Sequence, residues 1–313
     1  MKTLKKIAAV LAMILTLMAC KNSNSNKQTT SSEEGNSSGI ELPEDRLGGF
    51  LPKAPFGNST VDFQDDSVTI IENEGYSGFP KMMITYGNNF PVMEGVPNEF
   101  LHEVATTFQQ MFPQDSTLNL EKQHAVVNAM HQYNSAIPVF KGRYESIAEN
   151  ISEEVEKLSQ AYSVCDIIMY RDGTGRQTME VVEHILHAVT GAGLHIVMPE
   201  KWSFTDSESE VTRIMDKAVE AGLYDIAGYG DILEESKEVY QRVLVQEFAY
   251  WLISTYWNLQ EPYGPMEEEE WNIDNKEQLL EKLPEGYDLV RNTIDDIMKA
   301  PSMEVLEAFR KYN

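Results

Sequence analysis

Four ionisable side chains within residues 178–190 recur at helical spacing and carry the clearest chemical signal of the chain. Glu180, Glu183, His184 and His187 stand at positions i, i+3, i+4 and i+7. At about 100° per residue these side chains share one face of a helix, while the apolar residues of the segment fall on the opposite arc. The pattern therefore predicts a helix that presents two imidazoles and two carboxylates side by side.

Imidazole and carboxylate are the ligand types that zinc and similar divalent ions take. Helical residues three or four positions apart project together, so two of them can bind one ion. A solvated helix face with ordinary Glu–His pairs explains the same pattern in so acidic a chain. Both interpretations stay open at the level of the sequence. His195 follows closely after the four residues.

A second candidate ligand is Glu247, which stands in the otherwise apolar and aromatic run 243–253. A carboxylate in such a run is costly to bury unless a positive group meets it. A metal ion or His187 would meet it, and Arg242 or Arg213 would do so equally well.

The sequence Glu-His-Ile-Leu-His at 183–187, followed by a later helix with Glu-Phe-Ala-Tyr at 247–250, resembles the zincin metallopeptidases. Specifically, it resembles gluzincins of the anthrax lethal factor type, which carry His-Glu-x-x-His on one helix and a glutamate ligand on a later one. The resemblance implies a zincin-like fold, one zinc ion and peptidase activity. His187 would match the second histidine of the motif, and Glu247 the later glutamate.

The chain departs from that motif at its first two positions. Glu183 stands where the family has its first histidine ligand, and His184 where it has its catalytic glutamate. Coordination survives the exchange, because Glu183 and His187 still face together and a carboxylate binds zinc. We therefore expect His187, Glu247 and either Glu183 or His184 as metal ligands. Proton transfer during peptide hydrolysis would then be carried out by His184, or by Glu180 one turn away.

The order of the other elements indicates an α+β protein with a small mixed or antiparallel sheet. We expect one domain over residues 41–313, mixed in its first part (41–177) and mainly helical in its second (178–313). Ser152 is the expected N-cap of its helix, and the Gly-Ala-Gly sequence at 191–193 is expected to end the histidine-bearing helix. The expected strands are 67–71, 81–85, 136–141 and 164–170. The expected helices are 98–111, 120–133, 152–162, 178–190, 209–221, 233–256, 276–283 and 287–299.

The N-terminal residues 1–19 have the features of a signal peptide. Three lysines precede the apolar run 7–17, which is too short to remain across a bilayer. The Leu-Met-Ala-Cys sequence at 17–20 resembles a lipobox, which implies that Cys20 is diacylated and becomes the first residue of the mature protein. After Cys20 no apolar residue occurs before Ile40, so residues 20–40 are expected to form a flexible tether.

Charge and cysteine content restrict the partners. The chain has 25 Lys and Arg against 50 Asp and Glu, and loss of the three lysines of the signal changes its formal charge from −25 to −28. Such a surface repels the phosphate backbone of nucleic acids, so no nucleic-acid partner is expected. It also repels anionic lipid headgroups, so membrane attachment is expected to come from the acyl chains alone. Cys165 is the one other cysteine and is expected to be a small buried residue.

The sequence thus predicts a lipoprotein of the cell envelope, membrane-anchored and extracytoplasmic, with a zinc site and peptidase activity on a peptide or protein substrate. The alternative is a non-catalytic surface lipoprotein, a relic of a zincin, that binds a ligand or a partner.

Replacement of Cys20 by serine tests the anchor. We expect the Cys20→Ser protein to leave the membrane fraction or to keep its signal uncleaved, because the acidic domain offers no other attachment. Cell fractionation with immunoblotting measures both outcomes. Tight membrane association of a processed Cys20→Ser protein would show that the anchor lies elsewhere.

Overall fold

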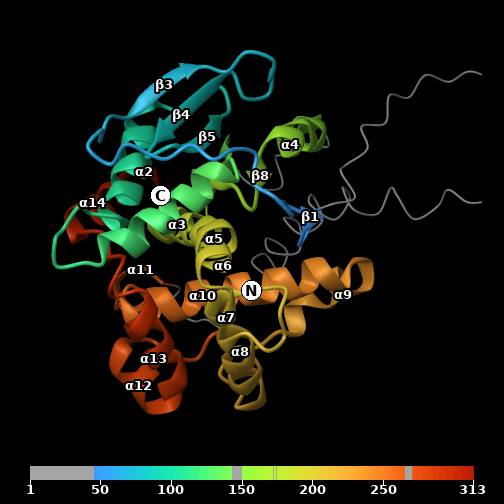
Figure 1. Cartoon of the computed structure of the whole chain (residues 1–313), viewed down its shortest axis with the longest axis vertical. Helices are drawn as coiled ribbons and strands as arrows, with labels where there is room; N and C mark the ends of the chain where they lie inside the picture. The colour runs from blue at the N-terminus through green and yellow to red at the C-terminus, as the bar shows by residue number, and fades with distance from the viewer. Residues whose placement is uncertain (1–45, 143–149, 172, 174, 265–269) are drawn as a thin grey trace, which may run out of the picture.

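The computed structural model describes residues 46–142, 150–171, 173, 175–264 and 270–313, which form an α+β fold (Figure 1). The strands are β1 (Arg46–Leu47), β2 (Leu51–Pro52), β3 (Thr69–Glu72), β4 (Lys81–Thr85), β5 (Asn88–Val92), β6 (Ser135–Ala136), β7 (Val139–Lys141), β8 (Ser163–Val164) and β9 (Ile168–Tyr170). The first helices are α2 (Asn98–Met111), α3 (Leu120–Gln132), α4 (Asn150–Ala161), α5 (Gln177–Ala188), η3 (Val189–Leu194), α6 (His195–Val197) and α7 (Pro199–Trp202). The later ones are α8 (Glu210–Glu220), η4 (Ala227–Tyr229), α9 (Gly230–Glu235), α10 (Lys237–Tyr256), α11 (Gln260–Tyr263), α12 (Lys276–Lys282), α13 (Pro284–Thr293), α14 (Met303–Glu307) and η5 (Ala308–Tyr312).

The main sheet is mixed. Strands β3, β4 and β5 are antiparallel neighbours, and β5 then pairs in parallel with both β6 and β7. Strand β6 pairs in parallel with β8, and β7 with β9. The predicted α+β class with a small sheet and a mainly helical second half is therefore confirmed.

Two of the predicted strands are each divided in two. The strand expected at 136–141 is interrupted at Pro138, which has no N–H to donate to a neighbouring strand. The strand expected at 164–170 is interrupted at residues 165–167, so Asp166 lies in the gap between β8 and β9. A carboxylate therefore stands between these two short strands.

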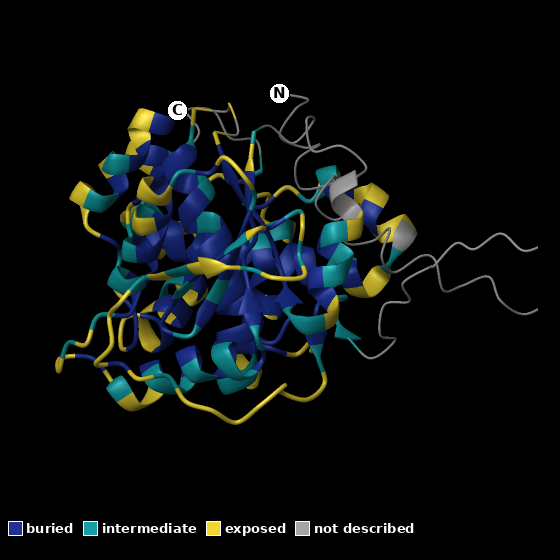
Figure 2. Ribbon diagram, turned by 90° about the horizontal axis from the view of Figure 1, so that it is seen from above, coloured by how far each residue is buried: buried dark blue, intermediate teal, exposed yellow. Residues whose placement is uncertain are grey.

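Alternate residues of the strands face two different cores. Val139 and Ile168 join the larger apolar cluster, which includes side chains of α2, α3 and α5. Phe140 and Met169 join a smaller cluster, which includes Val155 of α4. Helix α4 therefore packs on one face of the sheet and the other three helices on the opposite face. Figure 2 shows the buried residues gathered in the interior and the exposed ones around them.

Helix α10 crosses the helical half of the molecule and contacts α5, α8, α12 and α13 (Figure 1). Nearly every residue of its second half is buried. A helix that is apolar on all sides is expected to lie in the interior of a protein. Its position explains how Glu247, on this helix, comes beside α5.

The expectation that Gly-Ala-Gly at 191–193 ends the helix is wrong. Helix α5 continues into the π-helical segment η3 and then α6. A Cβ on Gly191 would lie 2.9 Å from Phe50 Cζ, and one on Gly193 2.8 Å from Val126 Cγ1 of α3. The two glycines are present because neighbouring side chains approach the helix closely, and not because the chain turns there.

Other helix boundaries also differ from the sequence predictions. Helix α4 begins at Asn150, so Ser152 lies inside it and is not its N-cap. The helix expected at 233–256 is two helices, divided at Ser236, whose side chain accepts a hydrogen bond from Val239 N and caps α10. Cys20 and the predicted signal and tether lie outside the described residues. Among the described helices, none combines the length and apolar character needed to span a membrane.

Gly193→Ala tests the close approach of α3 to η3. We expect the free energy of unfolding to fall by about 1–3 kcal/mol, since the added methyl group overpacks a filled core. The measurement is urea unfolding followed by circular dichroism. Gly230→Ala is the matched control, because a Cβ there meets nothing within 4 Å and the residue is helical with φ −56°. An equal loss of stability in both variants would contradict the packing explanation.

Candidate metal centre

The four residues predicted to share a helix face all lie on α5, and α10 brings Glu247 beside them. Nε2 of His187 is 3.6 Å from Oε2 of Glu247. Glu183, His187 and Glu247 each offer one ligand atom, and these atoms lie within 4.8 Å of one another. The two imidazoles of this face are not solvated, because His184 is 5% exposed and His187 fully buried.

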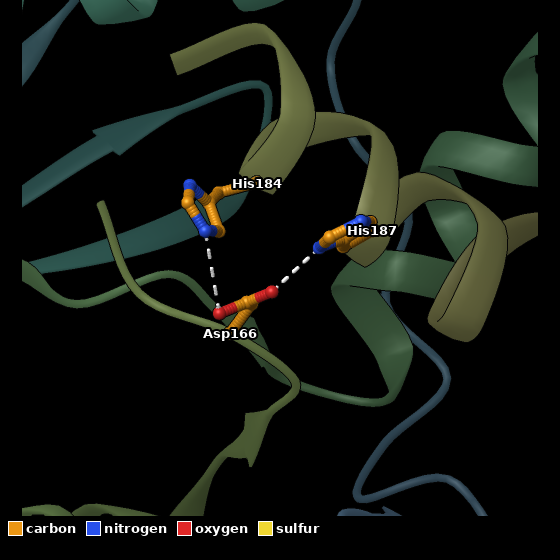
Figure 3. A group of neighbouring side chains, drawn as sticks. All are labelled: Asp166, His184 and His187. Atoms are coloured by element: carbon orange, nitrogen blue, oxygen red, sulfur yellow. Dashed lines mark hydrogen bonds and ion pairs between the residues drawn. The ribbon is translucent and has the colours of Figure 1, made fainter. Parts of the chain in front are cut away.

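Asp166 completes the site, although the sequence pattern did not single it out. Its carboxylate lies between the two imidazoles (Figure 3), with Oδ2 2.5 Å from His187 Nδ1 and Oδ1 3.6 Å from His184 Nε2. Oδ1 also accepts a hydrogen bond of 2.8 Å from Ile167 N. Asp166 is 1% exposed. The signal was present in the sequence, because a carboxylate within an apolar run needs a buried partner, just as Glu247 does.

The two nitrogens of His187 have different surroundings. Nδ1 donates to Asp166, an ionised carboxylate that can only accept. Nε2 is buried and has no hydrogen-bond partner among the described residues, since 3.6 Å to Glu247 exceeds hydrogen-bond length. A carboxylate bonded to one imidazole nitrogen, with the other directed at further ligands, is the arrangement of metal-binding histidines.

The acidic surroundings act on the protonation of His187. Burial disfavours its imidazolium form, but Glu247 and then Asp166 raise the pKa of His187 well above its ordinary value. Burial and the nearby Glu247 also raise the pKa of Glu183 to about 7. A divalent cation would relieve the same excess of negative charge and would displace protons on binding.

The spacing fits a single ion. Two ligand atoms about 2.1 Å from a tetrahedral zinc ion are about 3.4 Å apart, close to the distance found between His187 and Glu247. The side chain of Glu183 is 27% exposed and that of Glu247 12% exposed. The buried imidazole therefore has its two carboxylate neighbours on the side that solvent reaches.

His184 and Glu180 lie on the other side of Asp166 and belong to a different set of contacts. Nδ1 of His184 is 2.6 Å from the backbone oxygen of Glu180 and 3.4 Å from its Oε1. Burial opposes the charge of His184, but Asp166, Glu180 and Glu183 raise its pKa to about 9. Oε1 of Glu180 accepts a hydrogen bond of 2.7 Å from Met169 N on β9. The proton-transfer roles proposed for His184 and Glu180 stay predictions.

Among the described residues, the ion-pair partner of Glu247 is His187 and not Arg242 or Arg213. Arg242 donates to Cys165 O at 3.2 Å and to Gln246 Oε1 at 3.0 Å. In the described part of the chain, neither Arg242 nor Arg213 forms an ion pair with Glu247. The pairing of Glu247 with Arg242 or Arg213, which the sequence left open, is therefore not the arrangement that the structure has.

Tyr250, one turn after Glu247 on α10, packs edge-on against His187 with ring centroids 6.0 Å apart. Its hydroxyl is buried and lacks a hydrogen-bond partner within the described ranges. Burial, and then the charge of Glu183, raise the pKa of Tyr250 well above its usual value. The hydroxyl therefore stays protonated and is a donor beside the candidate ligands.

His195 does not take part in the centre. Its ring stacks on Phe204 with centroids 4.2 Å apart, and it is 6% exposed. Burial lowers the pKa of His195 to about 4. A second trio, Asp166, His184 and His187, also has ligand atoms within 4.8 Å of one another, and His195 belongs neither to it nor to the group of Glu183, His187 and Glu247.

Comparison with known proteins assigns no family to the chain. No protein-family model matches it, and no curated protein or solved structure is significantly similar to it.

Because folding lowers the pKa of His195, the free energy of unfolding depends on pH. The unfolded chain binds a proton at this residue below about pH 6.5 and the folded protein only near pH 4, so stability is lost as pH falls between these values. When the pH is lowered from 7.5 to 5, the free energy of unfolding of the wild type should fall by about 2 kcal/mol more than that of His195→Phe, which keeps the stacked ring. Urea unfolding at both pH values measures the difference. An identical pH dependence in both proteins would mean that His195 titrates normally.

Proposed function

We propose that this protein is a membrane-anchored lipoprotein of the cell envelope whose extracytoplasmic domain binds one divalent metal ion. Glu183, His187 and Glu247 are the proposed ligands, and lipid on Cys20 the proposed anchor. The observation that carries the metal site is Nε2 of His187, which is buried, has no hydrogen-bond partner among the described residues and lies 3.6 Å from Glu247.

Zinc is the proposed ion. One imidazole and two carboxylates are ligands that zinc accepts, and three protein ligands leave a coordination position for a substrate, as in catalytic zinc sites. Asp166 would hold the ring of His187 and keep the proton on Nδ1, so that Nε2 is the ligand atom. Other divalent ions bind such a set, and the metal content of the protein distinguishes them.

The proposed activity is hydrolysis of peptide bonds by a zincin-like site. A bound divalent ion would supply a Lewis acid for the reaction. The buried hydroxyl of Tyr250 beside His187 would donate a hydrogen bond to the substrate carbonyl. Proton transfer would be carried out by His184 or Glu180, as the resemblance to gluzincins implies.

A specific observation favours a second candidate, a non-catalytic metal-binding lipoprotein that recognises a ligand or a protein partner. The carboxylate of Glu180 is bonded to Met169 N, and His184 lies against Asp166 and Glu180 rather than beside Glu247. Proton transfer by either residue would require these contacts to change. The two candidates share the metal site and differ in whether the bound ion takes part in a reaction.

His187→Ala and Glu247→Gln test the metal site. We expect the purified soluble domain to bind about one zinc ion, and each variant to lose at least 100-fold in affinity, since each removes one of three ligands. Zinc at 100 times the Kd of the wild type should stabilise the wild type by about 2.7 kcal/mol and each variant by no more than about 0.4 kcal/mol. Elemental analysis and thermal unfolding with and without zinc measure these effects. His102→Ala, at an exposed histidine, is the matched control and should behave as the wild type.

Hydrolysis of a peptide library by the zinc-loaded domain separates the two candidate functions. Cleavage that is lost on chelation and in Glu247→Gln supports the peptidase. Stoichiometric zinc without cleavage supports the binding protein. Absence of zinc binding by the wild type would contradict both.

A further inference from the structure

A chain of buried polar side chains lies behind the candidate metal centre. It runs from Arg242 through Gln246 to Asp166, which bonds to His187. We infer that Gln246 is a positioning residue, which holds the carboxylate of Asp166 in place and thereby directs Nε2 of His187 toward Glu247. The inference rests on the proposed metal site and adds the residue that sets the geometry of its one imidazole ligand.

The chemistry of its neighbours fixes which way the amide of Gln246 points. Nη1 of Arg242 and Sγ of Cys165 both lie 3.0 Å from Gln246 Oε1. A guanidinium has only donors, so the amide oxygen must face Arg242. The NH₂ group is then directed to the opposite side, where it donates to Oδ2 of Asp166 at 3.2 Å.

This donor restricts the carboxylate of Asp166. Oδ2 accepts from Gln246 Nε2 and from His187 Nδ1, and Oδ1 accepts from Ile167 N. With hydrogen bonds to both oxygens, the carboxylate has little freedom to rotate. The proton of His187 is thus kept on Nδ1, and its ring is held so that Nε2 faces the carboxylate of Glu247.

The side chains of this polar series are buried, so each depends on its neighbours for hydrogen bonds. Arg242 is 2% exposed, Gln246 5% and Cys165 1%. Burial raises the pKa of the Cys165 thiol to about 12, so the thiol is a donor here and not a nucleophile. Well-packed apolar side chains would stabilise this part of the core at least as well as a buried polar chain. The polar chain is therefore better explained by the orientation that it imposes on Asp166 than by its contribution to stability.

Gln246→Met tests the positioning role, because methionine has a similar length and cannot donate to Asp166. We expect zinc affinity to fall 10- to 100-fold, the usual effect of removing a group that orients a metal-binding histidine. Competition with a chromogenic chelator measures the affinity. Gln123→Met is the matched control, since Gln123 is also buried and hydrogen-bonded but its amide donates to Pro113 O and Ile297 O. The control should lose stability and bind zinc as the wild type does.

A second measurement needs no metal. The proton between His187 Nδ1 and Asp166 Oδ2, which are 2.5 Å apart, should give a far-downfield signal in the proton NMR spectrum of the metal-free protein. We expect Gln246→Met to shift or broaden this signal and Gln123→Met to preserve it, while His187→Ala assigns it by removing it. If Gln246→Met does not fold, Gln246→Glu keeps the acceptor for Arg242, places a second carboxylate beside Asp166 and should have the same effects.

The outcomes separate the two levels of the proposal. Wild-type zinc affinity together with an unchanged proton signal in the Gln246 variants would overturn the positioning role. Failure of the wild type to bind zinc would overturn the proposed function, and the proton signal would still show whether Gln246 orders the Asp166–His187 pair. A loss of affinity that Gln123→Met shares would also overturn the inference, since it would then reflect stability alone.

Discussion

The arrangement of this domain depends on a buried carboxylate, Asp166, and on the groups that neutralise it. Its position in the gap between β8 and β9 places a negative charge where water cannot solvate it. Such a charge is stable only if donors and positive groups surround it. His184 and His187 supply them from α5, and the amide of Gln246 supplies another from α10. The edge of the sheet, the histidine-bearing helix and the central helix are therefore tied together at one carboxyl group.

The same interaction makes the centre a candidate site for a cation. Four carboxylates lie around two imidazoles: Asp166, Glu180, Glu183 and Glu247 around His184 and His187. Without a metal, the protein lessens this excess by taking up protons, which is the meaning of the raised pKa values of both histidines and of Glu183. A divalent ion would compensate this negative charge better on the side of Glu247, because there Nε2 of His187 is already directed at carboxylates. Metal binding would then release protons.

Periodicity within one helix was enough to group the residues of α5, and the boundaries of α2 and β4 also agreed with the sequence pattern. A contact between two helices was predictable only at Glu247, because a carboxylate in an apolar run needs a positively charged partner from elsewhere in the fold. Asp166 makes the same demand, but the apolar run around it predicts one continuous strand and gives no sign of the gap between β8 and β9. The continuation of the helix through Gly191 and Gly193 depends on how closely Phe50 and α3 approach, which no local pattern records. Local periodicity was therefore predictable, whereas the missed features depend on contacts between distant segments.

Glu183 and His184 stand where the gluzincin motif has a histidine and a glutamate. Because of helix geometry, the two replacements affect the centre differently. Glu183 is four residues before His187 and shares its side of the helix, so a ligand pair is kept when a carboxylate replaces an imidazole. His184 is about 100° further round, which directs it to the edge of the sheet and to Asp166 rather than to Glu247. In its present contacts it stabilises the buried carboxylate. Proton transfer by His184 would therefore require it to leave Asp166, whereas the side chains of Glu183 and Glu247 are partly exposed and already lie beside His187.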